Sequence, residues 1–251
     1  MQIATRSISA RKFLGMVAVL GCLLSVFPIL ATAQGAQGQN AVYPASGVCC
    51  KGSPAFIDAS QFLGNSQGVD LCDTINGILG NRFGGTYPSS GTIIDARGIR
   101  GSALTCTLGS PWTEGGTTVT APSTILLPAG TIIIPGTWVL PNYTRLVGAG
   151  DALDYLSTGT VSVGTTLQAC LPSVNHCSSS FSGSDMIDLG TSHCPASVCN
   201  SVSVENLTLD GLGQSLNGIV NTHAQTGSHV DHVSLFQLLG TGLSLSGNAS
   251  K

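Results

Sequence analysis

Short apolar runs separated by turn residues fill residues 123–150 of this 251-residue chain. The runs are Ile125-Leu126-Leu127, Ile132-Ile133-Ile134, Trp138-Val139-Leu140 and Leu146-Val147. Pro-Ala-Gly, Pro-Gly and Pro-Asn stand between them, and these residues favour turns. Each run is too short for a helix, and Ile, Val and Trp favour strands. Strands this short cannot each bury a face alone, so we expect them to stack as turns of a coil.

A repeat near the end of the chain indicates the same kind of stacking. Residues 202–209 align with residues 228–235 at an offset of 26, and Gly218-Ile219-Val220 aligns with Gly242-Leu243-Ser244 at an offset of 24. A period of this size is typical of stacked supersecondary units. The apolar spacing inside each unit shifts parity at Asn206, which predicts a corner or bulge there. Asn206 therefore has a structural interpretation, as a residue that tolerates the backbone of the corner, beside a functional one.

Three segments in succession give a strand, then a turn with proline, glycine and threonine, then a strand that ends in a glycine corner. They are Gly-Thr-Ile-Ile-Asp-Ala at residues 91–96, Leu-Leu-Pro-Ala-Gly-Thr at 126–131 and Leu-Pro-Asn-Tyr-Thr-Arg-Leu-Val-Gly-Ala-Gly at 140–150. This pattern resembles the opening of the pectate-lyase-superfamily right-handed parallel β-helix, over roughly residues 69–247. The resemblance implies an all-β solenoid, a fold that carries lyases, hydrolases, epimerases, tailspikes and adhesins. A disulfide-linked β-sandwich, built from antiparallel hairpins, is the alternative fold.

Residues 69–80 have helical periodicity. Apolar residues recur at Val69, Cys72, Ile75 and Leu79. Asp70 and Asp73 lie in the first turn, where the helix dipole favours anions, and Gly80 is a typical stop. We expect this helix to cover the open end of the coil, as terminal caps do in solenoids. The predicted fold is thus a right-handed parallel β-helix with an N-terminal capping helix, over residues 69–251.

The first 33 residues have the pattern of a secretory signal peptide. A basic segment is followed by an apolar segment at residues 13–30 and by the small-residue cleavage site Ala31-Thr32-Ala33. A membrane anchor, or a lipoprotein attached through Cys22, is the alternative. Residues 34–68 are rich in small and amide residues and are expected to be a flexible, disulfide-pinned lead-in. The protein is therefore expected to be secreted, to the periplasm or the extracellular space.

The net charge that remains after removal of the predicted signal peptide limits the classes of partner that the protein is expected to bind. Loss of 33 of the 251 residues leaves 218, with six basic residues against twelve acidic ones and a net charge of −6. An acidic, charge-poor surface argues against nucleic acid and against an anionic membrane as partners. It also disfavours a polyanionic substrate. No other run is apolar and long enough to span a bilayer.

Eight cysteines remain after cleavage, and an even number behind an export signal indicates disulfides. Short loops favour the pairs Cys170–Cys177 and Cys194–Cys199. The adjacent residues Cys49-Cys50 are poorly placed to bond to each other. We expect them to pair with Cys72 and Cys106, in an order that the sequence leaves open. A metal site made by cysteines and neighbouring histidines is the alternative, and otherwise no metal or cofactor is expected.

Carboxylates on the aligned strands are candidates for catalysis. Equivalent residues on stacked parallel strands lie about 4.8 Å apart, so the offset of 26 places Glu205 beside Asp231. Two carboxylates this close cannot both ionise easily, so one pKa should rise, and such a pair suits retaining glycoside hydrolysis. Asp210 and His232 lie on the same coils and complete the candidate catalytic set. Solvated surface carboxylates are the alternative interpretation.

The histidines and the basic residues limit other chemistries. His229 and His232 are three apart on a strand, so they face opposite sides unless a bulge realigns them, and no metal site is expected from them. The resemblance implies a basic residue and calcium for lyase chemistry, yet no Lys or Arg occurs between Val147 and Ser250. Asn221-Thr222-His223 departs at its third position from the Asn-Thr-Asp of polygalacturonases. Both chemistries lack their catalytic residues in this chain.

The resemblance implies a secreted carbohydrate-active protein that acts on or binds extracellular polysaccharide, as a glycoside hydrolase or polysaccharide lyase. The alternative is a non-catalytic β-solenoid, such as an adhesin or scaffold, or the structural N-terminal part of a longer enzyme. A strand pattern at residues 242–246 is followed by no capping helix. An uncovered coil end exposes unpaired backbone, so we expect further coils or an oligomeric partner to cover it.

Overall fold

The computed structural model describes residues 56–64, 70–83, 91–107, 109–113, 118–151, 164–192, 194 and 198–245. The chain divides into two units, Met1–Ala45 and Ser46–Lys251, and every described residue belongs to the second. The predicted signal peptide and Cys49-Cys50 lie outside the described residues. In the part of the chain that is described, no helix is long and apolar enough to cross a membrane.

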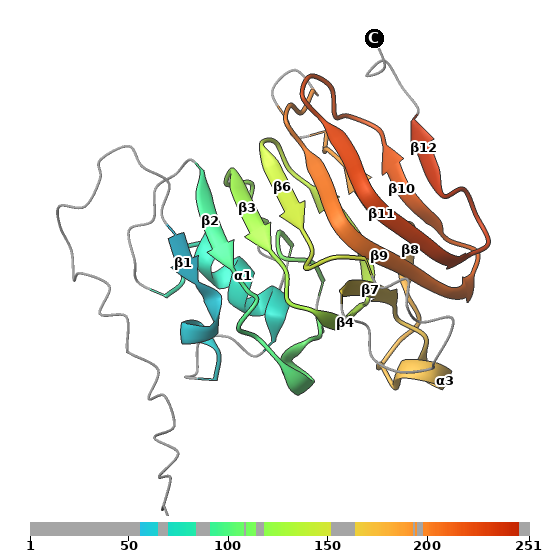
Figure 1. The fold of residues 1–251 in the computed structure, drawn as a ribbon, viewed down its shortest axis with the longest axis horizontal. Coiled ribbons are helices and arrows are strands. Elements are labelled where there is room, and N and C mark those ends of the chain that lie inside the picture. The colour runs from blue at the N-terminus through green and yellow to red at the C-terminus, as the bar shows by residue number, and fades with distance from the viewer. Residues whose placement is uncertain are drawn as a thin grey trace, which may run out of the picture. The chain divides into compact units, whose positions relative to one another are not determined.

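Parallel strands make up most of the described structure (Figure 1). In chain order the elements are β1 (Phe56–Asp58), η1 (Ala59–Phe62), α1 (Leu71–Leu79), β2 (Thr92–Asp95), η2 (Gly101–Ala103), β3 (Ser123–Leu126), β4 (Gly130–Ile134), β5 (Gly136–Leu140), β6 (Thr144–Val147), β7 (Thr165–Ala169), α3 (Pro172–Asn175), β8 (Ser182–Leu189), β9 (Ser203–Gln214), β10 (Asn217–Asn221), β11 (His229–Leu238) and β12 (Leu243–Leu245). The four apolar runs of residues 123–150 are β3 to β6, which confirms their prediction as strands.

The strands form two parallel sheets. The larger sheet runs β1-β2-β3-β6-β9-β7-β4, with β11 also paired to β9, and the smaller runs β12-β10-β8-β5. The start of β9 pairs with β6, whereas its later part, from Thr208 to Asp210, pairs with β7. The large sheet therefore curls in the middle of β9, and the chain passes in turn through three strand positions. The first position holds β2, β3, β6 and the start of β9, and the second holds β4, β7 and the later part of β9. The third position holds β5, β8, β10 and β12 of the smaller sheet. This curled parallel arrangement is consistent with a β-solenoid.

Apolar side chains stack in rows that follow the strand pairing, buried within the stack and more exposed where the rows reach β11 and β12. The row inside the first strand position is Ile57, Ile94, Ile125, Leu146, Val204 and Val230. The row inside the second is Ile132, Leu167, Leu209 and Leu235, and the row inside the third is Trp138, Ile187, Ile219 and Leu243. Each apolar side chain covers the next, so short strands bury in a stack what none could bury alone.

The repeat register predicted from the sequence is confirmed. Val204 pairs with Val230 at the offset of 26, and Ile219 pairs with Leu243 at the offset of 24. The predicted corner is also present, because Asn206 has a φ of 55°. Left-handed backbone is costly for most residues and tolerated by Asn. The geometry supports the structural interpretation of Asn206.

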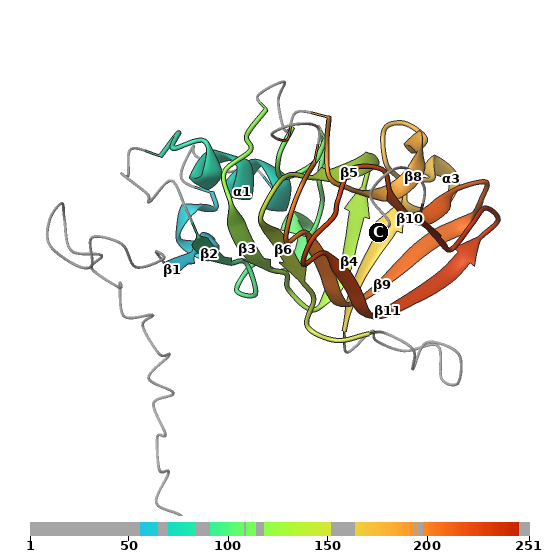
Figure 2. The same cartoon turned by 90° about the horizontal axis from the view of Figure 1, so that it is seen from above.

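The predicted helix is confirmed as α1. The Asp70 side chain caps it by accepting a hydrogen bond from the Asp73 N–H at 2.9 Å, and Gly80 ends it. Figures 1 and 2 show α1 beside β1 and β2, at one end of the large sheet. Its buried residues, including Leu71 and Ile75, join the common core.

The described residues include three disulfides, of which two agree with the prediction and the third corrects it. Cys170–Cys177 and Cys194–Cys199 are present. Cys72 bonds to Cys106, so the prediction that these two pair with Cys49-Cys50 is wrong. The reason is that Cys72 lies on the buried side of α1, and the loop that carries Cys106 is held there by the Thr107 N–H, which donates to Asp70 at 2.8 Å.

The segment predicted as a flexible lead-in contains an ordered strand. Strand β1 pairs with β2, and Ile57 packs on Ile94. A sequence signal existed, because Phe56-Ile57-Asp58-Ala59 matches Ile93-Ile94-Asp95-Ala96 in pattern. The parallel register of β1 and β2 follows that match residue by residue.

Candidate functional site

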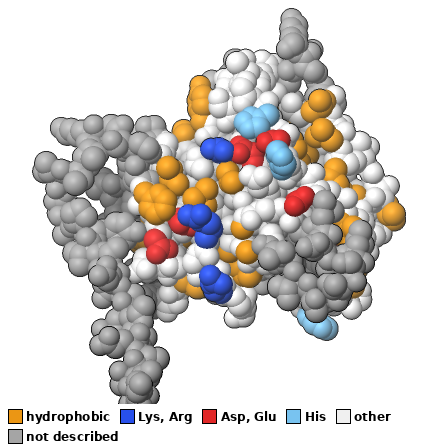
Figure 3. Space-filling view, viewed as in Figure 1, with side chains coloured by type: hydrophobic (Ala, Val, Ile, Leu, Met, Phe, Trp, Pro, Cys, Tyr) orange, Lys and Arg blue, Asp and Glu red, His pale blue; other side chains and the backbone are white. Residues whose placement is uncertain are grey.

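Polar side chains gather on the outward face of β6, β9 and β11. One row of paired positions holds Arg145, Ser203 and His229, and the next outward row holds Val147, Glu205 and Asp231. Together with His232, we call the polar members of these rows the polar outer face: Arg145, Ser203, Glu205, His229, Asp231 and His232. Figure 3 shows acidic, basic and histidine side chains close together on the face that these strands present in Figure 1.

Glu205 is the anchored carboxylate of this face. Arg145 donates to both of its oxygens, from Nε at 2.7 Å and from Nη2 at 2.6 Å. Ser203 Oγ donates at 2.8 Å, and only 8% of the Glu205 side chain is exposed. These hydrogen bonds, those from Arg145 above all, outweigh burial and lower the pKa of Glu205 to about 2. The sequence predicts that the pKa of one carboxyl group of the Glu205–Asp231 pair rises. The pKa of Glu205 is lowered instead, so Glu205 is not that group.

Arg145 is the residue of this face that the sequence pattern does not predict. Its pairing with Glu205 also raises its own pKa above the usual range. Stacking Leu146 on Val204, two apolar residues in matching strand patterns, would have placed Arg145 beside Ser203. Arg145 and Glu205 lie 60 positions apart in the chain, so the period of 24 to 26 residues does not connect them, which hides the match.

Asp231 occupies the predicted position beside Glu205 in the strand register. Its side chain is 60% exposed and lies 2.8 Å from His232 Nδ1. His232 has a φ of 49°, so the backbone forms the same left-handed corner here as at Asn206. His229 Nε2 lies 3.2 Å from Glu205, so the two histidines contact neighbouring carboxylates of one row and not opposite faces. Both imidazoles are mostly exposed.

Asp210 is set apart from this group. It lies on the part of β9 beyond the Asn206 corner and is buried. Gln168 Nε2 donates to it at 3.0 Å and the Leu212 N–H at 2.9 Å. These bonds suit a carboxylate that fixes the β7–β9 pairing. A catalytic role for Asp210 stays a prediction.

The chemistry that this face offers is hydrogen bonding in a nearly neutral setting. Arg145 and Glu205 compensate each other, which leaves Asp231 and the two imidazoles to meet solvent. Among the described residues no group of three or more His, Cys, Asp or Glu side chains is placed to hold a metal ion.

Comparison with protein-family models, with curated proteins and with solved structures gave no match. The function proposed below therefore rests on the polar outer face and on the strand register.

Proposed function

We propose that the protein is a secreted right-handed parallel β-helix of the pectate-lyase type that binds neutral extracellular polysaccharide along the polar outer face. The observation that carries this proposal is the alignment of His229, Asp231 and His232 with Arg145 and Glu205 on three stacked strands. Strands spaced at about 4.8 Å present equivalent side chains at regular intervals. Such a surface suits a polymer of repeating units.

The proposal names a neutral polymer because of the charges on this face. The Arg145 guanidinium is neutralised by Glu205 at 2.6 Å. Asp231 places a carboxyl group on this face with 60% of its side chain exposed, and this group disfavours a uronate chain. Sugar hydroxyls, by contrast, can donate to Asp231 and exchange hydrogen bonds with His229 and His232.

Glycoside hydrolysis by Glu205 and Asp231 is the second candidate, and their pairing in adjacent strands favours it. Glu205, with a pKa of about 2, would serve only as the ionised carboxylate. The proton for the leaving group would have to come from Asp231 or His232. Lyase chemistry is less suited, because Arg145 is already held by Glu205 and is no free base.

Affinity electrophoresis through gels that contain neutral polysaccharides or pectate tests the proposal. We expect the protein to be retarded by at least one neutral polymer, and the double variant His229→Gln/His232→Gln to lose most of this retardation. Arg100→Gln, a change of an exposed cation on another part of the chain, is the control and should migrate like the parent protein. Retardation by pectate alone, or equal retardation of the double variant, would refute binding at this face.

Release of reducing ends from the retarding polymer separates binding from hydrolysis. A binding protein leaves the polymer intact. A hydrolase releases reducing ends, and Asp231→Asn then lowers the rate by roughly a hundredfold, in the range of general acid–base contributions.

A further inference from the structure

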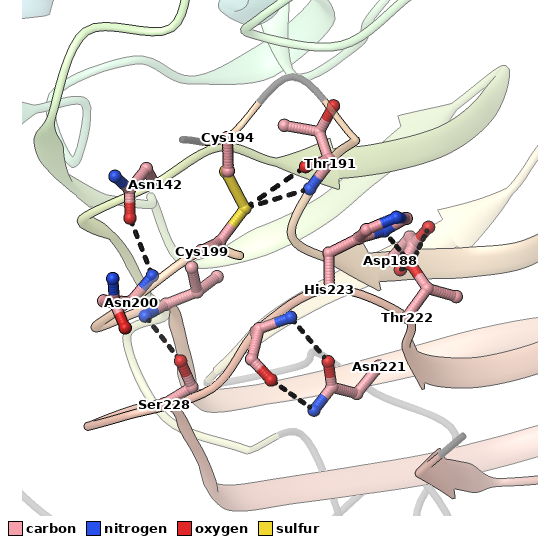
Figure 4. The surroundings of a disulfide bond; sticks show 12 residues. Asn142, Asp188, Thr191, Cys194, Cys199, Asn200, Asn221, Thr222, His223 and Ser228 are labelled. Carbon is pink, nitrogen blue, oxygen red and sulfur yellow. Dashed lines mark hydrogen bonds between the residues drawn. A yellow bond between two sulfur atoms is a disulfide. The ribbon is translucent and has the colours of Figure 1, made fainter. Parts of the chain in front are cut away.

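A second group of polar side chains lies where β8 and β10 end, on the smaller sheet. Thr222 Oγ1 donates to Asp188 at 2.8 Å and 3.1 Å, and it also lies 2.7 Å from His223 Nδ1 (Figure 4). The three residues therefore form a continuous chain of hydrogen bonds from a carboxylate through a hydroxyl to an imidazole.

The direction of this chain fixes the protonation of His223. A threonine hydroxyl has one proton, and that of Thr222 is given to Asp188. Oγ1 can then only accept from His223, so the proton of the neutral imidazole lies on Nδ1. The Nε2 lone pair then has no hydrogen-bond partner among the described residues, and part of the half-buried His223 side chain is accessible. This is the arrangement in which a histidine acts as a base.

The backbone holds His223 firmly in this position. The Cys199 N–H donates to the His223 carbonyl at 2.9 Å, and the bond Cys194–Cys199 closes the segment that carries it. Asn221 closes the turn from the other side by accepting from the Ala224 N–H at 2.9 Å. Figure 4 shows the disulfide and the Asn221 turn on either side of the segment that carries His223. Fixed side chains of this kind characterise functional sites.

Asp188 is placed to stabilise a positive charge on the His223 imidazole. Burial raises the pKa of the Asp188 carboxyl, and the Thr222 hydrogen bond and the nearby His223 act in the opposite direction. A carboxylate taken from water in this way gains from a positive charge nearby. No Lys or Arg belongs to the smaller sheet, so an imidazolium at His223 would supply that charge.

We propose that His223 is a general base that activates water for the hydrolysis of a neutral carboxylic ester. Nε2 takes one proton from water as its oxygen bonds to the ester carbon. The bond from that carbon to the alkoxy oxygen then breaks, and the imidazolium returns the proton to the leaving alkoxide. Water and ester give acid and alcohol, with no change of oxidation state. One histidine can serve both proton transfers, whereas a glycoside needs two carboxylates. The absence of Lys and Arg from this sheet favours a neutral substrate.

Hydrolysis of p-nitrophenyl acetate by the full disulfide-bonded chain tests the proposal. We expect His223→Gln to lower the rate above buffer by roughly a hundredfold. Thr222→Val, which removes the hydroxyl at nearly constant shape, should lower it as well, and Thr222→Ser should keep it. His176→Asn is the control, because His176 is an exposed residue with a φ of 56° that Asn tolerates. Equal rates for the parent protein and His223→Gln would overturn the proposal.

Nitrogen NMR of the unmodified protein reports the tautomer of the His223 ring directly, so this test does not depend on whether a variant folds. The His223 ring should be observed as the tautomer with its proton on Nδ1. A His223 ring protonated on Nε2 would overturn the proposal, because Nε2 would then have no lone pair to accept a proton from water.

Discussion

Glu205 lies beneath the Arg145 guanidinium, which donates to both carboxylate oxygens. The ordinary pKa of 4.5 falls to about 2 in the folded chain. A lowered pKa means that the ion pair stabilises the fold fully above the unfolded pKa, and that this stabilisation is lost as pH falls from about 4.5 toward 2. Because more than half of the Arg145 side chain is exposed, solvent screening reduces the contribution.

We therefore expect the free energy of unfolding of the parent protein to fall by about 2 kcal/mol more, between about pH 5 and pH 2, than that of Arg145→Gln/Glu205→Gln. Urea unfolding across this range measures the difference. Ser203→Ala keeps the ion pair and should retain most of the pH dependence. Parallel curves for the parent protein and the double variant would contradict the assigned pairing.

Asn206 should be replaceable wherever its backbone is tolerated. We expect Asn206→Gly to be nearly neutral and Asn206→Val to cost about 1–2 kcal/mol, because a β-branched residue is strained at a φ of 55°. Thermal unfolding of both variants gives the comparison. If Asn206→Gly abolished polysaccharide binding while leaving stability unchanged, Asn206 would have a functional role that its backbone does not explain.

At the scale of residues, apolar alignment alone located Glu205 beside Asp231 and the corner at Asn206. It did not locate Arg145, because Arg145 and Glu205 lie 60 positions apart in the chain and the alignment depends on a fixed period of 24 to 26 residues. It also could not show that Glu205 is neutralised, since this depends on which long side chain reaches the carboxylate.

The corner that follows β6 depends on a close backbone approach. A Cβ added at Gly148 would lie 2.2 Å from the Asn206 carbonyl oxygen and 2.8 Å from Leu207 Cβ. Backbone atoms cannot move aside cheaply, so we expect Gly148→Ala to destabilise the protein by about 2 kcal/mol or more. Gly213→Ala is the matched control, because Gly213 has a φ of 70° but nothing within 4 Å of an added Cβ. It should cost about 1 kcal/mol through backbone strain alone. A larger loss for Gly213→Ala in chemical unfolding would contradict the coil contact.

Helix α1 is joined to the loop before β3 through Asp70. This buried carboxylate caps the helix at Asp73 and also accepts from the Thr107 N–H and from Thr107 Oγ1 at 2.7 Å. We expect Asp70→Ala to lower the free energy of unfolding by about 2–4 kcal/mol, because it removes a cap and leaves buried donors without partners. Asp73→Ala, which leaves the cap acceptor in place, should cost less. Equal unfolding midpoints for the two variants would contradict this role.

At the scale of elements, helix periodicity and short apolar runs are sufficient to predict α1 and β3 to β6. The disulfide Cys72–Cys106 is not predicted, because its geometry depends on where the loop near Thr107 runs, and loops carry no periodic signal. Strand β1 is not predicted, because the polar composition around it obscures the four-residue match of residues 56–59 to residues 93–96.

For the whole molecule, the predicted stacking accounts for both sheets and for the continuous apolar rows between them. The edge formed by β11 and β12 carries exposed apolar side chains, namely Leu235, Leu239, Leu243 and Leu245. The expectation that further coils or an oligomeric partner cover this edge stays a prediction. The handedness of the coil likewise belongs to the proposal.

The most direct test of polysaccharide binding at the polar outer face is a titration of the protein with the retarding neutral polysaccharide, or an oligosaccharide from it, followed through the imidazole NMR signals. The proposal predicts that the His229 and His232 signals move in a saturable way, because both rings lie on this face. The His176 signal should stay in place, because His176 follows α3, away from these strands. Signals of His229 and His232 that do not respond while the polymer is bound would contradict the proposed site.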